Sequence, residues 1–176
     1  MADLSQGPDG KWRCAWGDSD DLYRGYHDEE WGRPVTDERG LYEKLSLECL
    51  QSGLSWALIL RKRDGIRDAF AGFGPPEVER LLQDARVIRN RRKLEAIVNN
   101  AQATVSMRED VPLQELVWSF RQRPDAKALA KELKRRGFVF VGPTTVYSTM
   151  QAVGIVNDHA DGCFVRDEVE AARSAV

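Results

Sequence analysis

The two histidines of this chain each lie near a cysteine, and the two pairs lie towards opposite ends of the sequence. One pair is Cys14 and His27, and the other is His159 and Cys163. Two cysteines and two histidines form a donor set that binds zinc tetrahedrally. A tetrahedron built from these four side chains would tie the two ends of the chain together, which restricts the folds that the chain can adopt.

The predicted metal site is structural rather than hydrolytic. His159 and Cys163 are spaced to face one way across a helical turn or a tight loop. Four protein ligands leave no open position for the water that a hydrolytic zinc activates. The alternative is that both cysteines are ordinary small buried residues and that both histidines are solvated or satisfied in the core. The spacing leaves this alternative open, because separated pairs are weaker evidence than two tightly spaced CxxC motifs.

The composition is typical of a soluble globular protein. A chain of 176 residues fits one domain and can bury a sizeable core without disulfides. It is 42% hydrophobic, has no apolar run of membrane-spanning length and starts with a polar segment unlike a signal peptide. We therefore expect a cytoplasmic, reducing location, in which cysteines act as ligands or core residues. We also expect a flexible tail over residues 1–12 and a single domain over 13–176, acting as a monomer.

The charge pattern leaves nucleic-acid binding open. A formal net charge of −2 argues against a protein that coats nucleic acid nonspecifically. Basic residues nevertheless gather in three clusters, at Arg61–Arg63, Arg86–Lys93 and Lys134–Arg136. Such clusters at helix ends can form a local phosphate-binding face. Solvated helix surfaces carry the same clusters, so both interpretations remain.

The hydrophobic periodicity predicts an all-α architecture in one globule. Thr36 is placed to cap a helix that carries Asp37 and Glu38 in its first turn and ends near Gly53. One segment, FVFVG at 138–142, resembles a strand, and one strand forms no sheet. Further helices are predicted at 54–70, ending before the glycines and prolines of 72–76, and at 77–85, 91–107, 113–120, 125–137 and 143–154.

Glu48 is the carboxylate whose position calls for an explanation. Leu41, Leu45 and Glu48 fall on one face of the predicted helix. Burial without a cation would raise the pKa of Glu48, whereas a cationic ligand would keep it ionised. The alternative is an ion pair or a rim position. Aromatic residues that could sandwich a flat ring, or simply form core, lie on both sides of it: Trp12, Trp16, Tyr23, Tyr26, Trp31 and Trp56.

Five segments carry a resemblance to a known family. They are RCAWGDSDDLYRGYHDEEWG, LSLECLQSGLSWALILRKR, VWSF, KRRGFVFVG and YSTMQAVGIVNDHADGC. Together they resemble the 3-methyladenine DNA glycosylase I family, bacterial helix-hairpin-helix enzymes of alkylation repair. The resemblance runs from about Arg13 to Cys163, so it implies one all-α glycosylase domain in which zinc joins the N- and C-terminal segments.

The resemblance also implies roles for individual residues. Cys14, His27, His159 and Cys163 match the ligands of one structural Zn²⁺ per chain. Glu48 matches the carboxylate that recognises the excised base, and the aromatic neighbours of the base match Tyr23, Tyr26 and Trp56. The loop that approaches the gap left in the duplex matches Gln51, Gly53 and Leu54.

The resemblance places the helix-hairpin-helix at residues 77–101, where a helix N-terminus and backbone amides would hold phosphate. Arg91 and Arg92 are the expected cationic DNA contacts in this segment. Its hairpin, VIRNRRK, lacks the glycine pair of a standard helix-hairpin-helix. The phosphate contacts of this hairpin are therefore an open expectation.

The implied activity is hydrolytic release of 3-methyladenine from double-stranded DNA. N3-methylation makes the adenine cationic and weakens its glycosidic bond, so the enzyme needs to flip the nucleotide, stack the base and offer Glu48 to its polar edge. No lysine stands out as a Schiff-base nucleophile, which favours a monofunctional enzyme without strand cleavage. The alternative is a zinc-stabilised, noncatalytic binder of damaged or distorted DNA, which would not need Glu48 beside an aromatic pocket. No membrane partner is expected.

Overall fold

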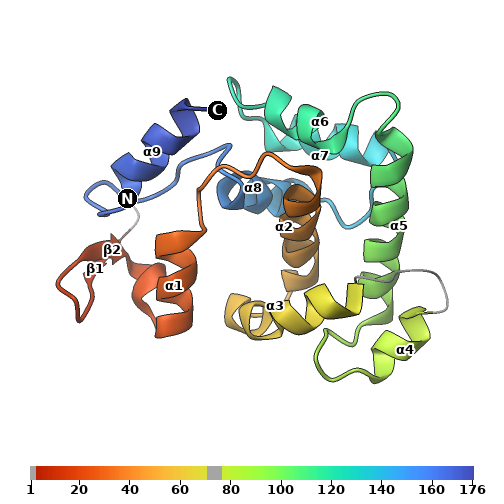
Figure 1. Ribbon diagram of the computed structural model, residues 1–176, viewed down its shortest axis with the longest axis horizontal. Helices are drawn as coiled ribbons and strands as arrows, with labels where there is room; N and C mark the ends of the chain where they lie inside the picture. Colours follow the sequence, from red (N-terminus) through yellow and green to blue (C-terminus); the bar gives the residue numbers. More distant parts are fainter. Residues whose placement is uncertain (1–2, 71–76) are drawn as a thin grey trace.

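The computed structural model describes residues 3–70 and 77–176, apart from the side chains of residues 68–70 and 77. The described part is predominantly helical, as the periodicity predicts (Figure 1). The glycines and prolines of 72–76, before which the helix at 54–70 was predicted to end, lie outside the described residues. The α-helices are α1 (Asp21–Glu29), α2 (Glu38–Gln51), α3 (Trp56–Phe70), α4 (Glu77–Gln83), α5 (Arg91–Met107), α6 (Leu113–Ser119), α7 (Ala126–Arg135), α8 (Pro143–Ala152) and α9 (Arg166–Ser174).

Residues 3–12 differ from the flexible tail that the polar sequence suggested. Strands β1 (Leu4–Gln6) and β2 (Trp12–Cys14) pair in antiparallel register, with Leu4 opposite Cys14. Each strand has three residues, too few to show the period-two alternation by which a strand is recognised in sequence. The all-α prediction is therefore corrected by one small hairpin, which is followed by a 3-10 helix, η1 (Ala15–Asp18).

The segment 138–142, whose pattern resembled a strand, is a connection between α7 and α8. Phe138 and Val141 are buried in the main core, while Val139 and Phe140 are exposed. Phe140 adopts a positive φ of 58°, which ends any extended run. The apolar side chains of this segment therefore belong to a turn between two helices, and their burial does not alternate as it would in a strand.

Helix α2 is the centre of the main core. It packs against α8, α5, α3 and α6, and Figure 1 shows it in the middle of the molecule. Its N-cap is Asp37 rather than the predicted Thr36, since an oxygen of Asp37 accepts from the Gly40 amide at 2.9 Å. Residues 44–50 are all buried. A helix enclosed on every side brings even its polar residues into the interior, and Glu48 is one of them.

A second, smaller core joins the two ends of the chain. It contains Cys14 and Tyr26 from the N-terminal segment with Cys163, Val165 and Val169 from the C-terminal segment. The Phe164 amide donates to the Trp12 carbonyl at 2.9 Å. The segment that leads into α9 consequently lies against the N-terminal hairpin, and Figure 1 shows α9 on the same side of the molecule as the hairpin. No helix in the described ranges has the length and apolar content to span a membrane.

Candidate functional site

A cavity of about 900 Å³ lies between the N-terminal segment, the C-terminal part of α2 and the start of α3 on one side, and α8 with the segment after it on the other. Its size is within the range of small-molecule sites. The residues that line it are Asp3, Leu4, Trp16, Tyr23, Tyr26, Trp31, Glu48, Gln51, Trp56, Ser148, Gln151, Asn157, Asp158, His159, Ala160, Asp161 and Arg166.

Glu48 lines this cavity and is 8% exposed. Burial raises its pKa to about 7, against the opposing charge of Lys44. Lys44 itself is engaged elsewhere: its Nζ lies 2.9 Å from Glu30 and 4.9 Å from the centre of the Tyr26 ring. Within the described part of the chain, the Glu48 carboxyl group has neither an ion pair nor a hydrogen bond. A buried carboxyl group without a partner favours a ligand that brings a positive charge or a donor.

Tyr26 and Trp56 form an aromatic wall beside Glu48. Their ring centroids are 5.2 Å apart and the rings are tilted by 56°. The Tyr26 hydroxyl and the Trp56 Nε1 are buried and have no hydrogen-bond partner among the described residues. Buried polar atoms are normally satisfied, so a ligand in the cavity has two polar atoms available to it.

Tyr23 and the tryptophans complete that wall. The Tyr23 hydroxyl accepts from the Ala57 amide at 3.1 Å, which satisfies one of the free amides at the start of α3. The Trp16 ring meets the Tyr23 ring edge-on at 6.2 Å and the Trp31 ring at 4.9 Å. Tyr23 therefore lines the cavity with its ring while its hydroxyl holds α3 in place.

The predicted loop at Gln51, Gly53 and Leu54 is a tight turn between α2 and α3. The Leu54 amide donates to the Gln51 carbonyl at 2.7 Å, and the Gln51 side chain donates to the Leu54 carbonyl at 3.0 Å. Gly53 has a φ of 75°, a conformation that favours glycine. Gln51 lines the cavity, Gly53 is exposed, and Leu54 is half-buried against the main core.

The opposite wall includes residues that the sequence patterns did not single out. Ser148 and Gln151 on α8 and the following Asp158 line the cavity. An oxygen of Asp158 accepts from the Tyr147 hydroxyl at 2.6 Å and from the Gln151 side chain at 2.7 Å. In sequence, Ser148 and Gln151 are polar positions on a short helix and Asp158 lies beyond its end, and nothing in their spacing distinguishes them from solvent-facing residues.

The ligand atoms of Cys14, His27 and Cys163 lie within 4.8 Å of one another, and all three residues are buried. His159 adjoins them: its ring centre is 5.0 Å from that of His27, and its buried Nε2 has no partner among the described residues. A hydrogen bond with Cys14 lowers the pKa of Cys163, and burial lowers the pKa of His159 to about 4. These shifts bring Cys163 and His159 towards the thiolate and the neutral imidazole, which are the forms that ligate metals.

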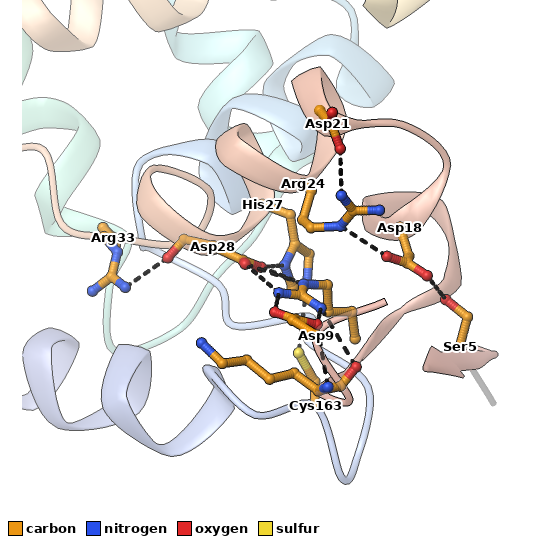
Figure 2. A network of polar contacts seen from close by, with 11 residues as sticks. Ser5, Asp9, Asp18, Asp21, Arg24, His27, Asp28, Arg33 and Cys163 are labelled. Atoms are coloured by element: carbon orange, nitrogen blue, oxygen red, sulfur yellow. Dashed lines mark hydrogen bonds and ion pairs between the residues drawn. The ribbon is translucent and has the colours of Figure 1, made fainter. Parts of the chain in front are cut away.

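Each histidine is oriented by a neighbour. The His27 Nδ1 lies 2.8 Å from an oxygen of Asp28, and the His159 Nδ1 lies 2.8 Å from the Asn157 side-chain oxygen. Both oxygens accept, so each Nδ1 carries the hydrogen. The Nε2 of His27 then faces the Cys163 sulfur at 3.5 Å, and the Nε2 of His159 has no partner among the described residues. Figure 2 shows Asp28 beside His27, with Asp9 near them and Cys163 at the other side of the ring.

Arg13 stabilises this arrangement through ion pairs with Asp28 and Asp9. Its side chain is 1% exposed and donates to Asp28 at 3.0 Å and to Asp9 at 2.6 Å. Arg13 precedes Cys14 on β2, and Asp28 follows His27 at the end of α1. One buried ion pair therefore fixes the strand and the helix that carry two of the four candidate ligands.

The basic clusters are partly neutralised. Arg91 pairs with Glu79 at 2.6 Å and lies 3.7 Å from Glu95. Arg136 lies 2.8 Å from both Glu132 and Asp110. Arg89 and Arg92 are exposed, and neither has an ion-pair partner in the described ranges. Of the two predicted cationic contacts, Arg92 is thus available to an anion directly, and Arg91 only by exchange with Glu79.

Two helix pairs are connected by short segments. Residues 84–90 join α4 to α5, and the Asn90 side chain accepts from the Lys93 amide at 3.2 Å, which caps α5. Residues 136–142 join α7 to α8, with Gly137 at a φ of 90°. Helix α8 follows Gly142 and has no side-chain cap. The second pair therefore has the glycines that the predicted hairpin lacks and free amides at its helix N-terminus.

Comparisons with known proteins agree on one family. The methyladenine glycosylase family matches residues 16–166. The chain is similar to DNA-3-methyladenine glycosylase 1 of Escherichia coli strain K12, with 44% identity over 86% of this chain and 95% of that protein. A crystal structure of 3-methyladenine DNA glycosylase I superposes with a TM-score of 0.81 at 44% identity, covering 86% of this chain and 98% of that one. A structure of a tyrosine-to-phenylalanine variant of 3-methyladenine DNA glycosylase I in complex with 3-methyladenine superposes with a TM-score of 0.80 at 32% identity. The match covers 87% of this chain and 96% of that one.

Proposed function

The chain belongs to the methyladenine glycosylase family, and from this premise we propose that it is a DNA glycosylase that releases 3-methyladenine from alkylated DNA. The observation that carries the proposal is the unpaired, buried carboxyl group of Glu48 in an aromatic cavity. A noncatalytic binder of distorted DNA would not require that arrangement. We further propose that the enzyme acts as a monomer on double-stranded DNA in the cytoplasm.

Base recognition in this proposal depends on charge. A 3-methyladenine nucleotide in DNA is cationic, and its ring would lie against the Tyr26 and Trp56 faces, which attract cations. Glu48 would face the polar edge of the base and become fully ionised when the cation enters, because an opposite charge lowers a carboxyl pKa. Neutral adenine gains neither interaction. Discrimination therefore follows from binding the flipped base, whose unstacking costs roughly a few kcal/mol.

The proposed chemistry needs little from the protein beyond positioning. The glycosidic electrons leave with the cationic base, which becomes neutral, and water attacks the oxocarbenium that develops on the sugar. Among the described residues that line the cavity there is no lysine, which supports hydrolysis without a Schiff base and without strand cleavage. Glu48 and the aromatic wall thus act on the base rather than on the water.

This assignment predicts a pH dependence. Because burial raises the Glu48 pKa to about 7, part of the free enzyme at neutral pH carries the protonated form, which attracts the cation less. We expect kcat/KM for 3-methyladenine release to rise with pH through about 7, since kcat/KM reports free-enzyme ionisations. Steady-state release from methylated duplex DNA between pH 5.5 and 8.5 tests this, with Glu48→Gln as the non-titrating control. A rising limb that persists in Glu48→Gln would assign the ionisation to another group.

We propose that DNA is held by the turn at Gln51, Gly53 and Leu54 and by backbone and cationic contacts beside it. Arg91 and Arg92 remain candidates for phosphate contact at the start of α5. The uncapped N-terminus of α8, preceded by the connection 136–142, is a further candidate for the hairpin that supplies amides to phosphate.

The dependence of DNA affinity on salt concentration distinguishes these contacts. Reversing both charges, Arg91→Glu with Arg92→Glu, should weaken binding of abasic-site duplex DNA and reduce the slope of log Kd against log salt by roughly 1–2, since each phosphate contact contributes about 0.9. Titrations between 50 and 300 mM salt measure the slope. The control is Lys127→Glu with Lys131→Glu, the same change of charge on the exposed side of α7. An equal slope for both double variants would move the DNA-binding face away from α5.

We also propose that Cys14, His27, His159 and Cys163 hold one structural Zn²⁺. The fit rests on three converging ligands, on the buried and unpartnered Nε2 of His159, and on a donor set of two sulfurs and two nitrogens. Zinc bound there would supply cross-linking between the ends of the chain. It would take no part in base release, since four protein ligands leave no open position for substrate.

A further inference from the structure

Lys93 is a lysine whose ammonium group lies inside the protein. The residue is 8% exposed, although lysines are rarely buried without a partner. Its Nζ donates to the Leu50 carbonyl at 2.8 Å and to the Ser52 carbonyl at 2.5 Å. Among the described residues, no carboxylate forms an ion pair with it. The ammonium is therefore held by backbone carbonyls alone, and burial lowers its pKa.

The two acceptors lie at the C-terminal end of α2. Carbonyls there lack partners within the helix and carry the negative end of its dipole, so a cation satisfies them well. Helix ends are more often capped from within their own segment, by glycine for example. Here the capping group comes from α5, 43 positions later in the sequence than Leu50. Lys93 thus joins two helices at one point.

That point lies at the turn between α2 and α3. Glu48 precedes it by one helical turn, and Trp56 follows it at the start of α3, so both sides of the turn belong to the cavity wall. Ser52 and Gly53 are exposed. The turn also has its own internal bonds between Gln51 and Leu54, but the Ser52 carbonyl is held by Lys93. Lys93 consequently ties the exposed part of the turn to α5.

The same lysine lies in the first turn of α5, directly after Arg91 and Arg92. We infer that Lys93 is a positioning residue that couples the N-terminal end of α5 to the turn at 51–54. When the N-terminal end of α5 contacts the DNA backbone, this coupling places the turn against the duplex. The inference rests on the proposed function. It assigns Lys93 to the DNA-dependent steps of the reaction and not to recognition of the free base.

Two substitutions test this role in the full-length protein. Lys93→Met keeps the length of the side chain and removes the charge and the donors, whereas Lys93→Arg keeps both. Three quantities are measured: the Kd for free 3-methyladenine, the Kd for abasic-site duplex DNA, and the single-turnover rate of base release from methylated duplex DNA. Lys127→Met, an exposed lysine on α7, is the matched control.

We expect Lys93→Met to slow base release and to weaken abasic-site binding by about tenfold or more, the size expected when charge-assisted hydrogen bonds are lost. Its Kd for the free base should stay within about twofold of wild type, and Lys93→Arg should restore most of the rate. If Lys93→Met does not fold, Lys93→Gln replaces it in the same assays.

Two results would overturn the inference. Release at the wild-type rate by Lys93→Met would show that the turn does not need the ammonium. A parallel loss of free-base binding would show that Lys93 supports the cavity as a whole. Failure of the proposed function would be seen separately, as a wild-type protein that releases no 3-methyladenine.

Discussion

Glu48→Ala should lower the single-turnover release of 3-methyladenine from methylated DNA by roughly 10²–10³-fold, the size of effect seen when one preorganised electrostatic contact is removed from a dry active site. The reason is that the Glu48 carboxyl group is buried, lines the cavity and has no partner among the described residues. Glu48→Gln should fall between wild type and Glu48→Ala, because the amide keeps some hydrogen bonding and loses the charge. Quench-flow release of the base is the measurement.

The aromatic wall provides an independent check on the same pocket. Trp56→Ala should weaken binding of free 3-methyladenine by roughly 1–3 kcal/mol, because it removes a stacking face. Circular dichroism and zinc content of each variant control for folding. If Glu48→Ala releases the base at the wild-type rate, Glu48 has a structural role and the pocket assignment is wrong.

Cys163→Ala should abolish tight zinc binding and lower thermal stability together. At free zinc 1,000-fold above its Kd, binding stabilises a folded protein by about 4.1 kcal/mol. For a chain of this size, such a loss corresponds to a fall in Tm of roughly 8–16 °C. Elemental analysis and calorimetry of the purified proteins measure both quantities. A wild-type protein that is free of metal and equally stable would refute the zinc proposal.

The neighbours of the cluster offer a graded test of the same site. Asp28→Asn removes the carboxylate that orients His27, and such changes lower metal affinity by roughly 10–100-fold. Asp9→Asn is the matched control, because Asp9 binds the same arginine without touching His27. Competition with a chelator gives the two affinities. Equal losses in both variants would mean that Arg13 anchoring, rather than orientation of His27, maintains the site.

The sequence predicted the long helices well because their apolar periodicity is strong. The range predicted for α5, residues 91–107, is the observed one, and α2, α3, α7 and α8 differ from their predicted ranges only near the ends. The predicted range for α6 ends one residue late. Helices α1 and α9 were not predicted, since nine polar-rich residues give a weak periodic signal and depend on tertiary contacts.

The residues of the candidate site could be predicted where a residue broke a pattern. Glu48 interrupts an apolar face, and the cysteines and histidines form a recognisable donor set. Gln151 and Asp158 break no pattern, because polar residues near a helix end are common, and only the packing of α8 against α2 brings them to the cavity. The buried Arg13 could not be predicted either, since burial of an arginine depends on partners distant in sequence.

The joining of the two chain ends has a consequence for synthesis. The contact between Cys163 and His27 spans 136 positions, and that between the Ala160 amide and Cys14 spans 146. Contacts so distant in sequence form late, because closing a long loop must precede them. A chain emerging from the ribosome exposes Glu48 and its aromatic neighbours long before α8 and Cys163 exist. The nascent chain therefore cannot enclose a base until α8 and the segment after it have been translated, because they form one wall of the cavity.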